Sequence, residues 1–342
     1  MDNLFSSQFK VLPVADDVSR PLWSVMIPTY NSAKYLRETL ASVLAQDYGS
    51  AAMQIMVVDD HSQKDDPEAI VKEMGNNRIE FYRQEVNVGH VKNFQTCIEL
   101  SRGKLIHILH GDDVIREGFY QKIGAGFEQA PEIGAAFCRH VIIDENSQPQ
   151  YTSVLEQPES GVLKNNWLEL IAGFQRIQPP SIVVKREVYE KIGGFDRRFR
   201  YAAEDWEMWV RIANYYPVWY EVEPLAMYRK QSNSLTGSTV KAGTYNRDLG
   251  LAVEIFQTYL PKDLASRIYT HSKRNCAFHS LIIADSLVKK NDMGTALVQI
   301  REALRLNRSF RVVRSAGRII ILDGSLWLWR TLSAKVGNYL KK

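Results

Sequence analysis

Three short apolar runs, each followed directly by polar side chains, constrain the fold of this 342-residue chain most strongly. The runs SVMIP, QIMVVDD and KLIHIL are rich in β-branched residues, and the segment between the first two has helical periodicity. Such runs predict parallel strands that are buried on both faces and joined by crossover helices. We therefore expect an α/β domain.

Polar residues gather where these strands are expected to end. In an open α/β sheet, ligands bind at the carboxyl ends of the strands. Four carboxylates placed there repel one another unless a cation or ligand donors offset their charge. The residues at the expected strand ends are Thr29, Tyr30, Asn31, Asp59, Asp60, Asp112 and Asp113. The pattern predicts a binding site at this edge.

Eight strings, in matching order and spacing, resemble the family 2 inverting glycosyltransferases, which have the GT-A fold. Between about Trp23 and Thr236 they read SVMIPTYN, ASVLAQDY, VVDDHS, NVGHVKN, LHGDDV, KIGGFDRRF, AEDWEMWVRIA and YRKQSNSLT. The resemblance implies a nucleotide-sugar-binding domain with a Rossmann-like mixed sheet. It also implies transfer from a nucleoside diphosphate sugar, with UDP-sugars favoured, to a glycan or lipid-linked acceptor. Stand-alone relatives are usually assigned to bacterial surface polysaccharide synthesis.

The resemblance also assigns the donor site. Tyr30 would stack on the base and Thr29 would bond its edge. Asp60 would accept from the ring N–H of the base, whereas Asp59, on the opposite side of the strand, would bond loop amides. The NVGHVKN string would lie near the donor at a helix N-terminus, which favours anions. The donor set is Pro28, Thr29, Tyr30, Asp60, Asn87, Gly89, Asn93, Asp112 and Arg229, the last of which would neutralise phosphate.

The string LHGDDV carries the prediction of a metal. A leaving nucleoside diphosphate carries negative charge, which Mg²⁺ or Mn²⁺ held by carboxylates would offset. By resemblance, Asp113 is the metal ligand and Asp112 bonds the ribose or the sugar. His110 stands where many relatives have Asp, and Gln231 stands where His is common. Glutamine can still bind Mg²⁺ through its carbonyl, so Gln231 is a second candidate ligand.

Inversion at the anomeric carbon requires a base opposite the leaving group, and a carboxylate at a helix N-terminus suits this role. In AEDWEMWVRIA the resemblance assigns the base to Asp205. The alternative is that these acids only stabilise the helix dipole. Either Trp206 or Trp209 is expected to stack on an acceptor sugar, and Trp206 is the candidate. The acceptor set is Glu204, Trp206, Gly194 and Phe195.

The sequence predicts three parts: a polar lead-in over residues 1–20, a catalytic domain over 21–240 and a helical region over 241–342. The chain is 45% hydrophobic and 24% charged, which suits a soluble enzyme with a large core. Its three cysteines, at positions 97, 138 and 276, are expected to be buried reduced thiols. Without a visible signal peptide or an apolar run of about 20 residues, we expect a cytoplasmic protein.

Positive charge is concentrated near the C-terminus. The segment from Arg308 to Lys342 holds eight basic residues and one acid, so it contributes +7 to a net charge of +4. On a helical wheel, one face holds Arg311, Arg314 and Arg318, and Val312, Val313, Ala316, Ile319 and Ile320 lie broadly opposite. Together with Trp327 and Trp329, this pattern favours an anionic membrane surface on the inner face of the cell membrane over nucleic acid. The alternative is a packed terminal helix whose basic face is solvated.

Two other functions remain open at this point. A sugar nucleotidyltransferase would show a glycine-rich basic first loop for its triphosphate, whereas PTYNSAKY contains no glycine. A non-catalytic nucleotide-sugar-binding relative is compatible with the departures at His110 and Gln231. Single-sugar addition is favoured over processive synthesis, because the QxxRW string of processive relatives is missing.

Overall fold

The computed structural model describes residues 10–15, 17–164, 166–231 and 235–323. The chain divides into two compact units. The first contains residues 1–171, 176–200 and 204–231, and the second contains residues 172–175, 201–203 and 232–342. The main division thus falls at residue 231, whereas the sequence places it at residue 240.

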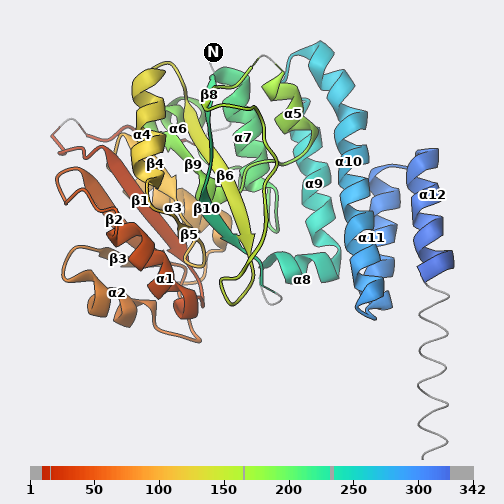
Figure 1. Cartoon of the computed structure of the whole chain (residues 1–342), viewed down its shortest axis with the longest axis horizontal. Helices are drawn as coiled ribbons and strands as arrows, with labels where there is room; N and C mark the ends of the chain where they lie inside the picture. Colours follow the sequence, from red (N-terminus) through yellow and green to blue (C-terminus); the bar gives the residue numbers. More distant parts are fainter. Residues whose placement is uncertain (1–9, 16, 165, 232–234, 324–342) are drawn as a thin grey trace, which may run out of the picture. The chain divides into compact units, whose positions relative to one another are not determined.

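The first unit is built on one ten-stranded sheet (Figure 1). Its main path runs β3-β2-β1-β4-β9-β6-β10-β5, with β7 beside β6 and β8 beside β10. Strands β1 to β4 pair in parallel, whereas β9 is antiparallel to both β4 and β6, so the predicted mixed sheet is confirmed. The strands are β1 (Trp23–Thr29), β2 (Met53–Asp59), β3 (Glu80–Arg83), β4 (Leu105–Ile108), β5 (Val114–Ile115), β6 (Ala135–Ile143), β7 (Pro149–Thr152), β8 (Gly161–Val162), β9 (Ile182–Lys185) and β10 (Val218–Arg229).

Helices connect these strands and cover the sheet. Asp66 caps α2 by accepting a hydrogen bond from the Ala69 amide, and Pro67 occupies the first turn, where its missing N–H costs nothing. The helices are α1 (Ala33–Leu44), α2 (Pro67–Gly75), α3 (His90–Leu100), α4 (Phe119–Gln129), α5 (Trp167–Gly173), α6 (Arg186–Ile192) and α7 (Glu204–Tyr215), with a short 3₁₀ turn, η2, at Pro179–Ser181. Because α1, α2 and α3 each follow a sheet strand, their N-termini lie near the edge where the parallel strands end.

The core of the first unit lies around β1 and β2. Every residue of both strands is buried, which confirms the prediction of strands covered on both faces. Val25, Ile27, Ile55 and Val57 belong to one continuous apolar cluster that also takes in buried residues of α1 and α4. Full burial of one such side chain stabilises the fold by about 1.5–3 kcal/mol. This core holds the ends of β1 and β2 in fixed positions.

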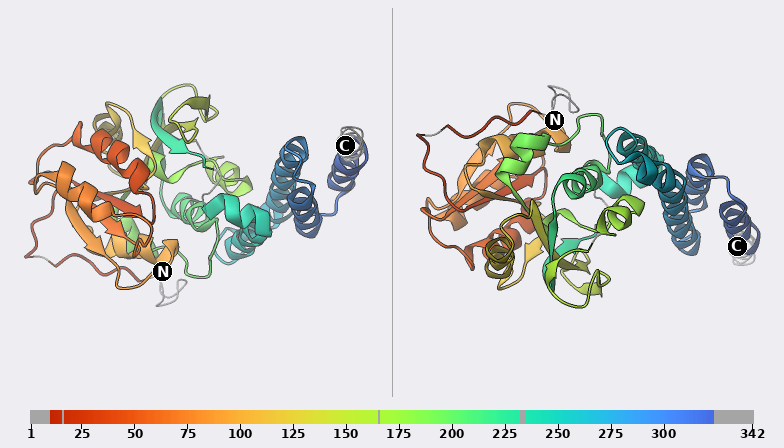
Figure 2. Two further views of the ribbon diagram at one scale, coloured as in Figure 1. Left: turned by 90° about the horizontal axis from the view of Figure 1, so that it is seen from below. Right: turned by 90° about the horizontal axis from the view of Figure 1, so that it is seen from above.

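The second unit is helical, as the sequence predicts. Figures 1 and 2 show α9 to α12 as neighbouring helices, and α10 packs against α9, α11 and α12. Its helices are α8 (Leu235–Ala242), α9 (Thr244–Phe256), α10 (Lys262–Lys289), α11 (Met293–Leu306) and α12 (Phe310–Arg318), followed by a π-helical turn, η3, at Ile319–Asp323. In the part of the chain that the structure describes, no helix combines the length and hydropathy that crossing a bilayer requires.

The apolar face predicted for the C-terminal segment is divided in the structure. Val312, Ala316 and Ile319 are buried in the core of the helical unit, whereas Val313 and Ile320 are exposed. Packing on α10 therefore uses part of the face that the sequence assigns to a membrane. Trp327, Trp329 and the rest of the predicted tail after residue 323 lie outside the described residues.

A buried ion pair links α7 to the turn that follows α6. Arg211 and Glu207 are each 1% exposed, and Nη2 of Arg211 lies 2.7 Å from Oε2 of Glu207. The same guanidinium donates to the carbonyl oxygens of Ile192 and Gly194, at 2.8 and 2.9 Å. Because all three acceptors bind one rigid fork, the pair fixes the helix that begins at Glu204 against this turn.

Removal of one partner should destabilise the fold strongly. Glu207→Gln removes the negative charge that lies 2.7 Å from the buried Arg211 guanidinium, and we expect a loss of about 3 kcal/mol in the free energy of unfolding. Urea denaturation followed by circular dichroism measures this loss. The matched control is Glu187→Gln, which breaks an exposed i,i+4 pair with Lys191 and should cost about 0.5 kcal/mol or less. Equal losses in the two variants would contradict the assignment.

Candidate active site

The ends of β1, β2 and β4 bring the predicted donor residues together. Thr29 is paired with Asp59 across β1 and β2, and the Gly111 amide donates to the Pro28 carbonyl. A Cβ on Gly111 would lie 3.0 Å from Thr29 Oγ1, so a small residue is needed there for the loop after β4 to approach β1. Tyr30 follows β1 with 47% of its surface exposed, which leaves its ring accessible to a base.

Asp59 cross-links the loops behind this edge. Its carboxylate accepts from the Ser62 amide and hydroxyl and pairs with Arg83 at 2.7 Å. Asp59 is fully buried. The predicted role of Asp59, bonding loop amides, is confirmed. Asn31 supports the same loop from a left-handed backbone conformation by accepting from the amides of residues 63 and 64.

Asp60 holds the loop before α3. Its two carboxylate oxygens accept from the amides of Val88 and Gly89 at 2.7 and 2.9 Å, and Asn87 Nδ2 donates at 3.1 Å. Burial raises the pKa of the Asp60 carboxyl, while the two backbone amides act in the opposite direction. An ionised carboxylate has about four lone-pair sites, and three are occupied by this loop. Three residues of the predicted donor set thus form one hydrogen-bonded unit.

Asn93 ties α3 to the sheet. Its Nδ2 donates to the Val58 carbonyl at 2.9 Å, and its Oδ1 accepts from Gln84 at 3.1 Å. With 2% of its surface exposed, the side chain lies beneath the edge of the sheet. The structure thus places Asn93 where it positions the helix that follows Gly89, and away from a donor at the surface.

Arg229 also lies beneath the site. Its side chain is fully buried, and its guanidinium packs over the Tyr35 ring at 4.5 Å. It donates to the Asp112 carbonyl at 2.7 Å and pairs with Glu38 at 2.6 Å. These contacts correct the sequence-based expectation for Arg229: a guanidinium engaged in this way supports the loop that carries Asp112 and is not presented to a phosphate.

His110, Asp112 and Asp113 form the cluster best suited to a metal in the described part of the chain. One ligand atom from each lies within 4.8 Å of the others. Asp113 is 1% exposed; its Oδ1 accepts from the Arg229 amide, whereas its Oδ2 is buried without a hydrogen-bond partner. Burial, followed by the Asp112 charge, raises the pKa of Asp113 well above its ordinary value. A divalent cation would relieve both effects, so the donor set fits one.

Gln231 reaches the same cluster. Its Nε2 donates to Asp112 Oδ2 at 2.7 Å, so the side chain meets the cluster through a hydrogen-bond donor. Burial lowers the pKa of His110, while the charges of Asp112 and Glu204 act in the opposite direction. Gln231 and His110, the two departures from the family pattern, therefore both lie at the candidate metal centre.

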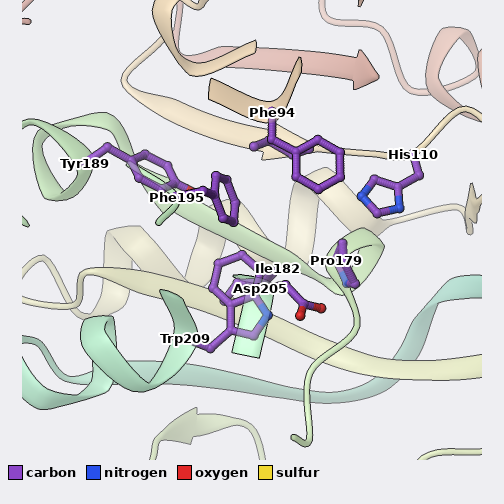
Figure 3. A pocket seen from close by; sticks show the side chains of 9 residues that line it. Phe94, His110, Pro179, Ile182, Tyr189, Phe195, Asp205 and Trp209 are labelled. Atoms are coloured by element: carbon purple, nitrogen blue, oxygen red, sulfur yellow. The ribbon is translucent and has the colours of Figure 1, made fainter. Parts of the chain in front are cut away.

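A small, mostly apolar pocket joins His110 to Asp205. Figure 3 shows the Asp205 carboxylate pointing into this pocket from the first turn of α7, with His110 on the opposite wall. Phe94 stacks on His110, with ring centroids 4.9 Å apart, and meets Phe195 edge to face at 5.6 Å. The lining residues are Phe94, Ile108, His110, Pro179, Ile182, Tyr189, Phe195, Asp205 and Trp209.

Glu204 lies beside this pocket and interacts with His90. His90 Nε2 is 3.4 Å from Glu204 Oε2, and Glu204 is 7% exposed. Burial raises the pKa of Glu204, but His90, the backbone amide of Glu204 and His110 together outweigh this effect, and the net direction is downward. Glu204 is therefore an ionised carboxylate beside Asp205. His90, which begins α3, was not among the predicted site residues.

The two tryptophans of α7 differ in position. Trp206 is fully buried, and its indole N–H donates to the Ile171 carbonyl at 2.6 Å, so the prediction that it stacks on an acceptor sugar is wrong. Trp209 lines the pocket instead, and its Nε1 is buried without a hydrogen-bond partner. Helical periodicity alone could not decide between residues three positions apart, which lie on neighbouring parts of one helix face.

The turn that follows α6 contributes to the pocket wall. A Cβ on Gly194 would lie 2.0 Å from Gln95 Oε1, so glycine permits close packing of this turn on α3. Phe195 then enters the pocket wall with 2% of its surface exposed. The sequence did not identify Phe94, Tyr189 or Pro179 as pocket residues. Phe94 directly follows the NVGHVKN string, which is the one local signal that marks it.

Comparison with known proteins gives the family. The model of glycosyl transferase family 2 matches residues 24–193. An uncharacterised protein of Mycobacterium tuberculosis is 31% identical over 58% of this chain and 64% of its own length, so the match spans less than two thirds of that relative. An uncharacterised glycosyltransferase of Rickettsia prowazekii is 26% identical over 66% of this chain and 69% of its own length.

Solved structures share the fold at low sequence identity. Staphylococcus aureus TarS 1–349 in complex with UDP-GlcNAc has a TM-score of 0.64 and 18% identity over 83% of this chain and 82% of its own. A mannosyltransferase from Pyrobaculum calidifontis in complex with GDP-Man and Mn²⁺ has a TM-score of 0.54 and 17% identity. The match covers 99% of this chain and 92% of the mannosyltransferase. The α/β domain described above thus has the GT-A fold, and this domain belongs to the family 2 glycosyltransferases.

Proposed function

We propose that this protein is an inverting, metal-dependent glycosyltransferase that uses a nucleoside diphosphate sugar, with a UDP-sugar favoured, and a glycan or lipid-linked acceptor. One observation carries the proposal: the Asp205 carboxylate and the His110 side of the metal cluster face each other across a single pocket. A transferase that inverts needs a base and a leaving-group site on opposite sides of one sugar. The proposed role is bacterial surface polysaccharide synthesis.

The donor would bind along the ends of β1, β2 and β4. The exposed Tyr30 ring offers a stacking surface for the base, and Thr29 and the Asp60–Asn87–Gly89 unit line the same edge. Asp113, with Asp112 beside it, would hold a divalent cation, which would act as a Lewis acid at the leaving diphosphate. The sugar would then lie between this cluster and Asp205.

Asp205 would take the proton of the acceptor hydroxyl. Its Oδ1 accepts from the Trp206 amide at 2.7 Å, which fixes the orientation of the carboxylate. As the hydroxyl loses its proton to Asp205, its oxygen bonds to the anomeric carbon from the face opposite the breaking bond to phosphate. The aromatic walls formed by Phe94, Phe195 and Trp209 exclude water and so favour transfer over hydrolysis.

Trp209 is the proposed contact for the acceptor. Its ring lines the pocket beside Asp205, and its buried N–H can donate to a sugar hydroxyl. Glu204, which is paired with His90, lies in the same turn of α7, and its carboxylate oxygens can accept hydrogen bonds from hydroxyls of the acceptor sugar. Trp206 contributes through packing, because its N–H is already bonded to Ile171.

The exposed side of α12 and η3 supports contact with a membrane. Phe310, Val313, Ile320 and Ile321 are between 46% and 78% exposed. Arg311, Arg314 and Arg318 of α12 are exposed as well. An apolar strip next to a basic strip suits the interface of an anionic bilayer. We propose that the enzyme works at the cytoplasmic face of the cell membrane, where a lipid-linked acceptor would be presented.

The first test concerns the base. Asp205→Asn keeps the shape and removes the basicity, so turnover should fall by roughly 10²–10⁴-fold while donor binding stays near normal. Release of UDP from a panel of UDP-sugars measures turnover, and calorimetry measures binding. Asp263→Asn is the matched control, because Asp263 is an exposed acid in the first turn of α10 and has only the helix-dipole role. Turnover retained in Asp205→Asn would refute the proposal.

The same assay separates the rival functions. A binding protein without activity would bind the UDP-sugar but release no UDP, with or without acceptors. A nucleotidyltransferase would incorporate label from UTP and a sugar phosphate into a UDP-sugar. Neither result is expected from the wild-type enzyme.

The second test separates the two tryptophans. Trp206→Phe removes a buried N–H from the Ile171 carbonyl and should lower the free energy of unfolding by about 1–3 kcal/mol. Trp209→Phe should cost less stability but raise KM for the acceptor several-fold without changing donor binding. Urea denaturation and steady-state kinetics give the two readouts. If Trp206→Phe alone affected the acceptor KM, the assignment would be reversed.

The third test concerns the membrane. The wild-type protein should bind phosphatidylglycerol vesicles at low salt and leave them as the salt concentration rises. Arg314→Gln should weaken binding by about 1 kcal/mol, or roughly fivefold, and Phe310→Ser should weaken it further. Leu297→Ser, at an exposed apolar position on α11, is the control. Equal binding to neutral phosphatidylcholine vesicles would show that the segment does not recognise anionic lipid.

A further inference from the structure

The partly buried imidazole of His110 faces the acidic cluster at the end of β4. His110 Nδ1 lies 3.8 Å from Asp113 Oδ2, and its Nε2 is buried without a hydrogen-bond partner. The stack on Phe94, with planes 20° apart, restrains the ring against rotation. One ring nitrogen of a histidine in its neutral form carries a lone pair, so this imidazole can bind a cation in the same space as the oxygens of the two carboxylates.

The distances suit a single ion. Two donors bound to one divalent cation at about 2.0–2.2 Å lie at most about 4.4 Å apart. The three ligand atoms here are within 4.8 Å of one another, so small side-chain rotations would bring all three within bonding distance of one cation. Asp113 supplies an independent sign of a ligand, because its Oδ2 is aimed into the cluster from a side chain that is 1% exposed and has no partner for that oxygen.

We infer that His110 is a direct ligand of the metal, and that its nitrogen makes the site prefer a first-row transition ion such as Mn²⁺ or Co²⁺ over Mg²⁺. Mg²⁺ favours oxygen ligands in near-ideal octahedra, whereas imidazole binds transition ions more readily. Affinity should therefore follow the order Co²⁺, Mn²⁺, Mg²⁺ from tightest to weakest. The inference rests on the proposed metal-dependent function and adds the ligand that sets the choice of metal.

The competing explanation is that His110 is only an aromatic wall of the pocket. His110→Phe separates the two, because it keeps a ring stacked on Phe94 and removes both nitrogens. His110→Asp replaces the nitrogen with an oxygen donor and tests the choice of metal. His61→Asn is the matched control: His61 lies at the neighbouring strand end with a left-handed backbone that Asn tolerates.

The experiment is Mn²⁺ binding to the full-length protein, with and without UDP, followed by pulsed electron paramagnetic resonance. The wild type and His61→Asn should both show ¹⁴N modulation from a coordinated imidazole, and His110→Phe should show none. Mn²⁺ affinity, measured by titration, should fall about 10-fold or more in His110→Phe. His110→Asp should bind Mn²⁺ without ¹⁴N modulation and discriminate less between Mn²⁺ and Mg²⁺ than the wild type does.

Three results would overturn the inference: no ¹⁴N modulation in the wild type, modulation that persists in His110→Phe, or tighter binding of Mg²⁺ than of Mn²⁺ by the wild type. The measurements distinguish a wrong ligand assignment from a wrong proposed function. If UDP-sugars are turned over while no nitrogen is bound to Mn²⁺, the function stands and the ligand assignment falls. If no UDP-sugar is turned over but the nitrogen signal appears, the ligand assignment stands and the function falls.

Discussion

Buried carboxylates at the ends of the strands hold this active-site edge together. Asp59 bonds the loop after β2, Asp60 bonds the loop before α3, and Asp113 accepts from the backbone of β10. A buried ionised carboxylate is costly unless several donors surround it, and backbone amides supply those donors without losing side-chain entropy. The hydrogen bonds that offset the cost of burying these carboxylates therefore also link loops that are far apart in sequence.

The same arrangement leaves one oxygen of this system without a protein donor. Asp113 Oδ1 is satisfied by a backbone amide, while its Oδ2 faces His110 and Asp112. Fixed loops thus place carboxylate oxygens where a divalent cation would bind, and that cation would offset the negative charge of a departing diphosphate. The opposite wall of the pocket is mostly apolar, because aromatic rings line it beside Asp205, the proposed base.

The sequence could predict the elements of the site because they are local. The strands that end in PTYN, VVDDHS and LHGDD are short apolar runs, and their polar ends are adjacent in sequence to what buries them. The sequence could not predict that Arg229 would be fully buried over Tyr35, or that Trp206 and not Trp209 would bond Ile171. Those outcomes depend on which partner occupies the space beside each side chain, and the partners are distant in the chain.

The order of motifs along the chain therefore determined the α/β class, the edge at which the ligand site forms and the residue types available there. Only the tertiary structure decided which of those side chains remain free for chemistry. In the folded chain, Asn93 and Arg229 donate to backbone carbonyls beneath the site, and His110 lies opposite Asp205 across one pocket. The physical reason is that hydrogen-bond capacity is finite: a donor or acceptor used by a distant backbone group is no longer available to a substrate.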